Sequence, residues 1–121
     1  MTTCLVVDDE KNIQNLLRKF LSGSGFNVIT ASSGEEALAI IDRELIDLMI
    51  LDKKMPGIGG SGVVAGLRER KSRFPFIFLS GSLVIDDELL TDDPNINCCA
   101  VMAKPVDLNN LLEAIDRALS R

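Results

Sequence analysis

Hydrophobic residues along the chain gather into short, nearly continuous runs. Their length and their lack of alternation with polar residues predict strands that are buried on both faces of a sheet. The five runs lie at residues 4–7, 26–29, 48–51, 76–79 and 98–102. The segments between the runs have apolar residues at helical spacing, so the pattern predicts strands and helices in alternation.

The intervening segments predict five helices. The first has apolar residues at i, i+3, i+4, i+7 and i+8, namely Ile13, Leu16, Leu17, Phe20 and Leu21. The second begins at a capping box over residues 33–36, and the last follows Asp107 as its N-cap. The third covers about residues 62–71. The fourth, within residues 83–97, is the weakest, because acidic residues and a proline stop its apolar pattern.

Alternating strands and helices predict βαβ units with right-handed crossovers. We therefore expect an α/β fold of the flavodoxin-like (βα)5 type, a doubly wound five-stranded parallel sheet with strand order 2-1-3-4-5. The 121 residues contain no repeat, linker or low-complexity segment, so the sequence predicts a single domain over residues 1–121.

Composition narrows the possible functions. Hydrophobic residues make up 46% and charged residues 26% of the chain, which excludes a disordered protein. The net charge of −5 argues against direct binding of nucleic acid, which needs a basic face. Because the chain has no His, Ser-His-Asp triads, Cys-His pairs and zinc sites built on imidazole are excluded.

The cysteines and the apolar runs indicate a compartment. Cys4, Cys98 and Cys99 are odd in number and lack C-x-x-C spacing, so we expect small hydrophobic residues in a reducing environment rather than disulfides. The longest continuous apolar run, residues 48–51, is far shorter than the roughly 20 residues that span a bilayer. No signal peptide is visible either. We therefore expect a cytoplasmic protein without a membrane partner.

Charged and hydroxyl side chains stand where the predicted strands end. After the first, third, fourth and fifth strands come, in order, Asp8-Asp9-Glu10, Asp52, Ser80 and Lys104. Ligands bind beyond these ends in a doubly wound sheet, so we expect the residues to share one rim. Taken singly each has a simpler explanation, since an acidic residue there is often only a helix N-cap.

Carboxylates gathered on one rim repel each other. At about 4 Å and an effective dielectric constant near 20, each pair costs roughly 4 kcal/mol. A cation relieves this repulsion, and a cluster of oxygen donors without sulfur or imidazole favours a hard ion such as Mg²⁺. Lys104 suits phosphate oxygens, Ser80 can donate a hydrogen bond to one, and a carboxylate can act as the nucleophile that forms an aspartyl phosphate.

The motifs at the strand ends, in this order and at these spacings, resemble those of response regulator receiver domains. The matching segments are Val6-Val7-Asp8-Asp9-Glu10, Leu51-Asp52-Lys53-Lys54-Met55-Pro56 with Gly60, Leu79-Ser80-Gly81 and Ala103-Lys104-Pro105. The resemblance covers essentially the whole chain. It implies a phosphoacceptor domain of a two-component or phosphorelay system, which is a signalling protein rather than an enzyme.

The resemblance also implies how the phosphoryl group is accepted. Asp52 would be the phosphoacceptor, and the donor would be a histidine kinase or a histidine phosphotransfer protein. Mg²⁺ would be bound by Asp8, Asp9, Asp52 and the backbone carbonyl of Lys54.

Other matched residues would pass the signal on. Ser80 would be the switch hydroxyl that follows the phosphoryl group, and Lys104 would be its counter-charge. The bond between Lys104 and Pro105 would be cis. The output would be contact with a downstream protein or effector domain that the sequence does not identify.

Two other functions stay open beside this one, the first supported by a departure from the family pattern and the second opposed by one. Val101 stands three residues before Lys104, where the family usually has an aromatic switch residue, and this favours a binding module that signals without phosphorylation. A Mg²⁺-dependent phosphatase with an aspartyl nucleophile usually has a second Asp two residues later, where this chain has Lys54. In place of the aromatic residue, we expect the acidic segment 86–97 to act as the conformational switch.

Overall fold

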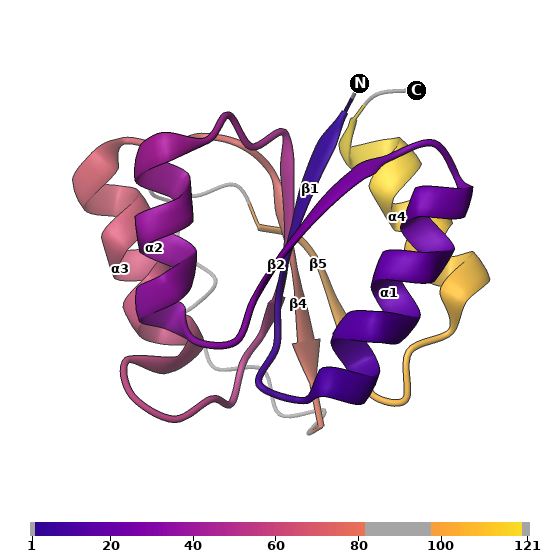
Figure 1. The fold of residues 1–121 in the computed structure, drawn as a ribbon, viewed down its shortest axis with the longest axis horizontal. Coiled ribbons are helices and arrows are strands. Elements are labelled where there is room, and N and C mark those ends of the chain that lie inside the picture. The colour runs from indigo at the N-terminus through magenta and orange to yellow at the C-terminus, as the bar shows by residue number, and fades with distance from the viewer. Residues whose placement is uncertain (1, 82–97, 120–121) are drawn as a thin grey trace.

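A five-stranded parallel sheet forms the centre of the molecule (Figure 1). The structure, a computed structural model, describes residues 2–81 and 98–119. In chain order the strands are β1 (Thr3–Val7), β2 (Asn27–Ala31), β3 (Leu48–Asp52), β4 (Phe76–Ser80) and β5 (Cys98–Ala103). They lie side by side in the order β2-β1-β3-β4-β5, which confirms the predicted doubly wound topology.

Four helices flank the sheet in the part of the chain that the structure describes. One face is covered by α1 (Lys11–Gly23) and α4 (Leu108–Ala118), and the other by α2 (Gly34–Arg43) and α3 (Gly59–Arg70) (Figure 1). The fourth predicted helix, within residues 83–97, and the acidic segment 86–97 lie outside the described residues. None of the described helices is long and apolar enough to cross a membrane.

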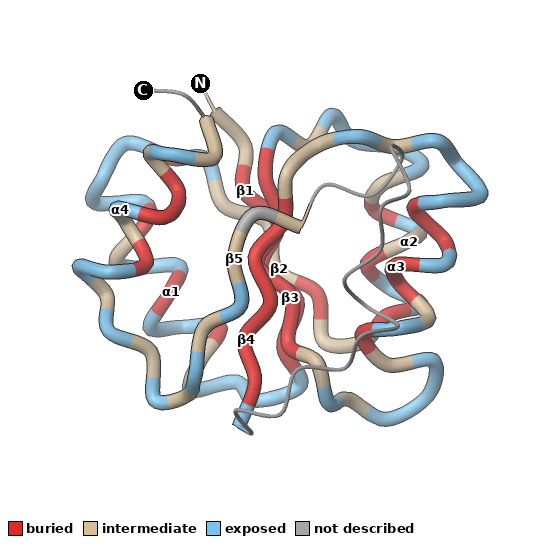
Figure 2. The backbone as a smooth tube through the Cα atoms, turned by 180° about the vertical axis from the view of Figure 1, so that it is seen from behind, coloured by how far each residue is buried: buried red, intermediate tan, exposed pale blue. Residues whose placement is uncertain are grey.

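Alternate residues of the central strands point into two separate cores. The core beneath α2 and α3 contains the strand residues Leu5, Val7, Met49, Leu51, Phe76 and Phe78. The core beneath α1 and α4 contains the strand residues Cys4, Val6, Leu48, Ile50, Ile77 and Leu79. Because both sets are buried, β1, β3 and β4 have no side facing solvent (Figure 2). This explains why their sequences are continuously apolar.

The two edge strands do not follow the prediction of burial on both faces. Only Ala31 is buried in β2, and Val101 on β5 is 40% exposed. An apolar run reveals a strand, but its position in the sheet decides how much of it is covered. The bounds of β2 are also shifted, because Phe26 precedes the strand and packs into the core beneath α1 and α4.

The third helix begins three residues earlier than the predicted start at residue 62. Glycines lower helix propensity there, but contacts with the rest of the fold override this preference. A Cβ at Gly66 would lie 2.5 Å from Cδ2 of Leu38 on α2, so the missing side chain lets α2 and α3 pack closely.

The first helix packs with most of its predicted apolar face, since Ile13, Leu17, Phe20 and Leu21 all contact the core beneath α1 and α4. Its buried residues are Gln14, Leu17 and Leu21, whereas Leu16 is 43% exposed. A polar residue, Gln14, thus occupies one position of the buried stripe, which the spacing of apolar residues alone does not reveal.

Side chains cap α2 and α4 as predicted. Oγ of Ser33 accepts a hydrogen bond from the Glu36 amide at 3.1 Å, and Oδ1 of Asp107 accepts one from the Asn110 amide at 3.0 Å. The reciprocal half of the capping box differs, because Oε2 of Glu36 accepts from the amide of Ser32 at 3.3 Å and not from that of Ser33. This contact ties the loop after β2 to the start of α2.

Cys4 is a fully buried residue of β1, as its sequence context predicts. Burial raises the pKa of its thiol to about 12, so Cys4 stays protonated at physiological pH. A buried thiol without thiolate character is chemically inert. The thiol of the half-buried Cys98, on β5, donates to the backbone carbonyl of Ala100 at 3.7 Å.

Ile50 tests the packing of the sheet, because it is fully buried in the middle of β3. Ile50→Ala should lower the free energy of unfolding by about 2–5 kcal/mol, since it removes buried apolar surface and leaves a cavity. The control Leu45→Ala, at a residue that is 91% exposed, should change it by less than about 0.5 kcal/mol. Urea denaturation followed by circular dichroism measures both, and equal losses would contradict the described core.

Candidate functional site

The carboxyl ends of the strands meet at one rim of the sheet. Backbone hydrogen bonds continue past the strands, from the amide of Asp8 to Ala31 O (3.0 Å), of Lys53 to Leu79 O (2.9 Å) and of Lys104 to Ser80 O (2.9 Å). The backbone at the rim is therefore fixed by the sheet itself. The predicted Lys104–Pro105 cis bond is present beside it.

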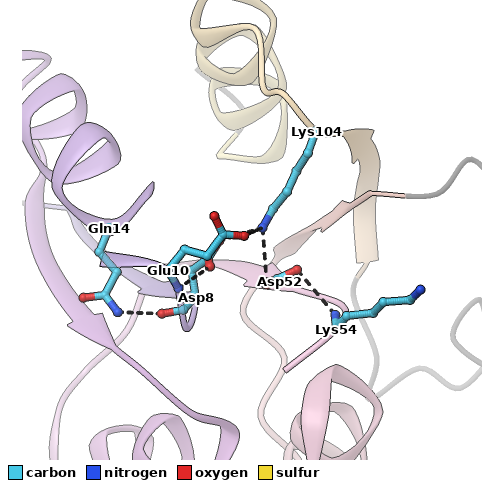
Figure 3. A network of polar contacts seen from close by, with 6 residues as sticks. All are labelled: Asp8, Glu10, Gln14, Asp52, Lys54 and Lys104. Atoms are coloured by element: carbon cyan, nitrogen blue, oxygen red, sulfur yellow. Dashed lines mark hydrogen bonds and ion pairs between the residues drawn. The ribbon is translucent and has the colours of Figure 1, made fainter. Parts of the chain in front are cut away.

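Lys104 lies among three carboxylates at this rim (Figure 3). Its Nζ is 3.0 Å from Oδ2 of Asp8, 3.3 Å from Oδ2 of Asp52 and 3.6 Å from Oε1 of Glu10. The side chains of Asp8 and Asp52 are only 1% and 6% exposed. Little water screens these ion pairs, so the charges interact more strongly than in an exposed salt bridge.

Asp52 is a carboxylate in an unfavourable environment. Burial and, after it, the negative charge of Asp8 raise the pKa of Asp52 to about 6, although Lys104 and the amide of Lys54 favour the ionised form. One ammonium therefore does not fully offset two neighbouring buried carboxylates. A further cation at the rim would stabilise the ionised form of Asp52.

Lys104 supplies a permanent positive charge. Burial by itself would lower the pKa of Lys104, but the hydrogen bond to Asp8 and the charges of Asp52 and Asp8 outweigh it, so this pKa is raised. The ammonium is thus charged at any physiological pH. Its position next to Asp52 suits it to hold the oxygens of a phosphoryl group.

Three consecutive acidic residues follow β1. Carboxylate oxygens of Asp8, Asp9 and Glu10 all lie within 4.8 Å of one another, with Asp8 buried and the other two exposed. The N-cap position of α1 is Glu10, whose side chain makes no capping hydrogen bond. Asp9 therefore does not have the simpler role of a helix cap. The donors are all oxygen and partly face solvent, which fits a hard divalent cation that keeps several waters.

Lys54 and Ser80 contribute to the rim in different ways. The Lys54 amide donates to Oδ1 of Asp52 at 3.4 Å, while the Lys54 side chain extends away from Asp52 (Figure 3). The main chain of Lys54, and not its ammonium, therefore lies at the site. Ser80 ends β4 directly after Leu79, the residue paired with Asp52, and is 3% exposed.

Close backbone contacts hold the loop that follows Asp52. The amide of Gly60 donates to Lys53 O at 3.2 Å, and a Cβ at Gly60 would lie 3.0 Å from that oxygen and 3.1 Å from Asp52 O. From α2, Oε1 of Glu35 accepts a hydrogen bond from the amide of Ile58 at 3.4 Å. Gly60 therefore allows the loop to lie close to the start of α3.

Two contacts of the rim were not predicted from the sequence. Glu10 approaches Lys104, and Gln14 on α1 donates to the backbone carbonyl of Asp8 (Figure 3). Because Glu10 belongs to the acidic run Asp8-Asp9-Glu10, the sequence could have indicated its contact with Lys104. Gln14 lies three residues before the buried Leu17, and a polar residue in a buried helical stripe needs a partner.

Known proteins with similar sequences point to one family. The family model for the response regulator receiver domain matches residues 4–116. The transcriptional regulatory protein GlrR of Escherichia coli (strain K12) is 33% identical over 117 residues, which cover 97% of this chain and 26% of GlrR. The chain spans about a quarter to about half of the length of the curated relatives it matches.

Solved structures show the same fold. A response regulator receiver domain protein from Clostridium thermocellum has a TM-score of 0.85 and 29% identity, covering 100% of this chain and 96% of that one. The response regulator protein TrrA from Thermotoga maritima, solved in complex with Mg(2+)-BeF, has a TM-score of 0.81 and 33% identity. That match covers 98% of this chain and 100% of TrrA.

The raised pKa of Asp52 predicts how stability depends on pH in the metal-free protein. Ionisation of Asp52 is less favourable in the folded than in the unfolded chain. It therefore lowers the free energy of unfolding by its full amount above about pH 6, and this loss disappears as the pH falls toward about 4. Asp52→Asn, which is neutral throughout, should therefore be more stable than the unsubstituted protein at about pH 8. The difference should shrink as Asp52 becomes protonated. Urea denaturation with a chelator present measures it, and a difference that grows toward low pH would refute this account.

Proposed function

Since the chain belongs to the response regulator receiver domain family, we propose that Asp52 accepts a phosphoryl group from a phosphohistidine. The donor is a histidine kinase or a histidine phosphotransfer protein. The observation that supports this best is the contact of Lys104 Nζ with the buried carboxylates of Asp52 and Asp8, at 3.3 and 3.0 Å. This arrangement provides a nucleophile and a fixed positive charge within one hydrogen-bonding distance.

The transfer forms one bond and breaks another. A carboxylate oxygen of Asp52 attacks phosphorus, and the bond between phosphorus and the donor's imidazole nitrogen breaks, leaving its electron pair on nitrogen. Asp52 is ionised above about pH 6, so it needs no base to become a nucleophile. Lys104 Nζ, already directed at Asp52, then holds oxygens of the transferred group, and positioning and charge provide most of the rate enhancement.

A divalent cation fits the remaining acidic groups. We assign Mg²⁺ to Asp8, Asp9, Asp52 and the backbone carbonyl of Lys54, because the oxygen donors beside β1 and the excess negative charge at Asp52 suit a hard ion. When bound, Mg²⁺ supplies neutralisation of the charge on the phosphoryl oxygens. Lys104 and the protein main chain would orient the phosphoryl group.

Ser80 and Lys104 are the residues that would report the phosphorylated state. Ser80 ends β4 directly after Leu79, the residue paired with Asp52, and its hydroxyl would follow a phosphoryl group on Asp52. Lys104 exchanges carboxylate contacts for phosphoryl contacts, which alters the charge balance around Asp8. Receiver domains are regulatory switches, and we propose a switched protein–protein output here rather than turnover of a substrate.

The two alternative functions have less support. An aspartyl phosphatase needs an acid/base two residues after the nucleophile, where Lys54 directs its side chain away from Asp52. A module that signals without phosphorylation has no need for the buried Asp8–Lys104–Asp52 cluster. Similarity to response regulators favours neither alternative.

Where the domain acts follows from the proposed donor. Histidine kinases transfer phosphoryl groups to cytoplasmic partners, so we propose that this domain acts in the cytoplasm. With a net charge of −5, its own partners are proteins rather than nucleic acid or membrane. Any effector that it controls is a downstream protein or a further domain.

Phosphorylation by a small acyl phosphate tests the proposal. With Mg²⁺ present, the intact mass should rise by one phosphoryl group, and Asp52→Asn should abolish the increase because the nucleophile is lost. Asp9→Ala should raise the Mg²⁺ concentration that labelling requires. Asp116→Asn, which removes a carboxylate far along the chain on α4, is the control and should label normally. Labelling that persists in Asp52→Asn would refute Asp52 as the acceptor.

A further inference from the structure

Gln14 is a buried polar residue outside the residues assigned to phosphoryl transfer. Among the residues that the structure describes, the buried polar or charged ones are Asp8, Gln14, Asp52 and Ser80. Three of them belong to the rim, and Gln14, which is 1% exposed, lies on α1. Burying an amide is unfavourable unless its hydrogen bonds are made, so the partners of Gln14 explain its position.

The Gln14 amide bonds two different loops. Its Nε2 donates to the backbone carbonyl oxygen of Asp8 and, at 3.0 Å, to Oγ of Ser32 (Figure 3 shows the first contact). Asp8 begins the turn between β1 and α1, and Ser32 lies in the loop after β2. One side chain on α1 thus links the turn that contains the acidic residues to a neighbouring loop.

The turn at Asp8 is held from several directions. Its amide donates to Ala31 O at 3.0 Å, its side-chain Oδ1 accepts from the Glu10 amide at 2.9 Å, and its carbonyl accepts from Gln14. The carbonyl belongs to the peptide unit that leads into Asp9. Fixing this carbonyl therefore fixes the direction in which the chain places Asp9.

The second partner of Gln14 is itself anchored. The Ser32 amide donates to Oε2 of Glu36 at 3.3 Å, and Nζ of Lys11 lies 3.5 Å from Oγ of Ser32. These contacts hold Ser32 in place just before α2. The hydrogen bonds of Gln14 to Ser32 and to Asp8 therefore hold the Asp8 turn in a defined position relative to Ser32.

We infer that Gln14 is a positioning residue, which sets the carboxylates of Asp8 and Asp9 for cation binding through the Asp8 main chain. The inference rests on the proposed function, because it concerns the Mg²⁺ that the acidic residues would bind. Gln14 contacts the main chain of Asp8 and not its carboxylate, so it would act through Asp8 and Asp9 and not as a ligand of the cation. Groups that orient metal ligands typically change metal affinity about 10–100-fold when they are removed.

The chemistry of the side chain suggests two variants. Gln14→Met keeps the length of the side chain but removes both donors. Gln14→Glu keeps the shape and replaces the donor with a carboxylate that cannot donate to the Asp8 carbonyl when ionised. The control is Leu17→Ala on the next turn of α1, because Leu17 is fully buried but lies in the apolar core.

Binding of Mn²⁺, measured by electron paramagnetic resonance as a probe for Mg²⁺, separates positioning from stability. Gln14→Met and Gln14→Glu should weaken Mn²⁺ binding by about tenfold or more. Leu17→Ala should lower the urea midpoint of unfolding while its Mn²⁺ affinity stays within about twofold of the unsubstituted value. Variants at Gln14 that bind Mn²⁺ normally would overturn the inference. An unsubstituted protein that does not bind Mn²⁺ would instead refute the metal site of the proposed function.

A second measurement needs no metal. Amide hydrogen exchange of Glu10 in the metal-free protein reports the turn, because this amide donates to Oδ1 of Asp8. Gln14→Met should make the Glu10 amide exchange faster, and Leu17→Ala, compared at equal global stability, should not. Unchanged exchange at Glu10 in Gln14→Met would overturn the inference even if metal affinity fell.

Discussion

The ammonium of Lys104, shared between the buried carboxylates of Asp8 and Asp52, is the interaction on which the rim depends. Asp8 follows β1 and Asp52 ends the neighbouring strand β3, while Lys104 follows β5 at the edge of the sheet. The long lysine side chain therefore has to pass the end of β4 to reach both. The strand order of this fold brings the three groups together, so the chemistry of the site depends directly on the topology.

The central strands make that arrangement rigid. Each of β1, β3 and β4 has one set of side chains in the core beneath α2 and α3 and the other in the core beneath α1 and α4. A shift of one residue in register would exchange the two sets and place every side chain in the wrong core. The register is therefore strongly determined, and the residues just beyond the strands inherit the same fixed positions.

Much of the fold and of the candidate site could be predicted from local patterns. Continuous apolar runs revealed the strands, and polar residues at their ends indicated Asp8, Asp52, Ser80 and Lys104. Features that depend on three-dimensional neighbours could not be predicted in this way. The exposure of Val101 depends on its place in an edge strand, and the burial of Gln14 on its hydrogen bonds to Asp8 and Ser32. The direction of the Lys54 side chain depends on a loop held by Gly60 and Glu35.

The contact between Lys104 and Asp8 also spans nearly the whole chain, with a separation of 96 positions. During synthesis the ribosome therefore completes β1 and β3 long before their counter-charge emerges. Until then the two carboxylates lack this ammonium, and burying them together is unfavourable. We expect the N-terminal part of the nascent chain to remain loosely packed at this rim, with folding completed once β5 has joined the sheet. The acidic rim therefore becomes fully stable only when β5, which precedes Lys104, has joined the sheet.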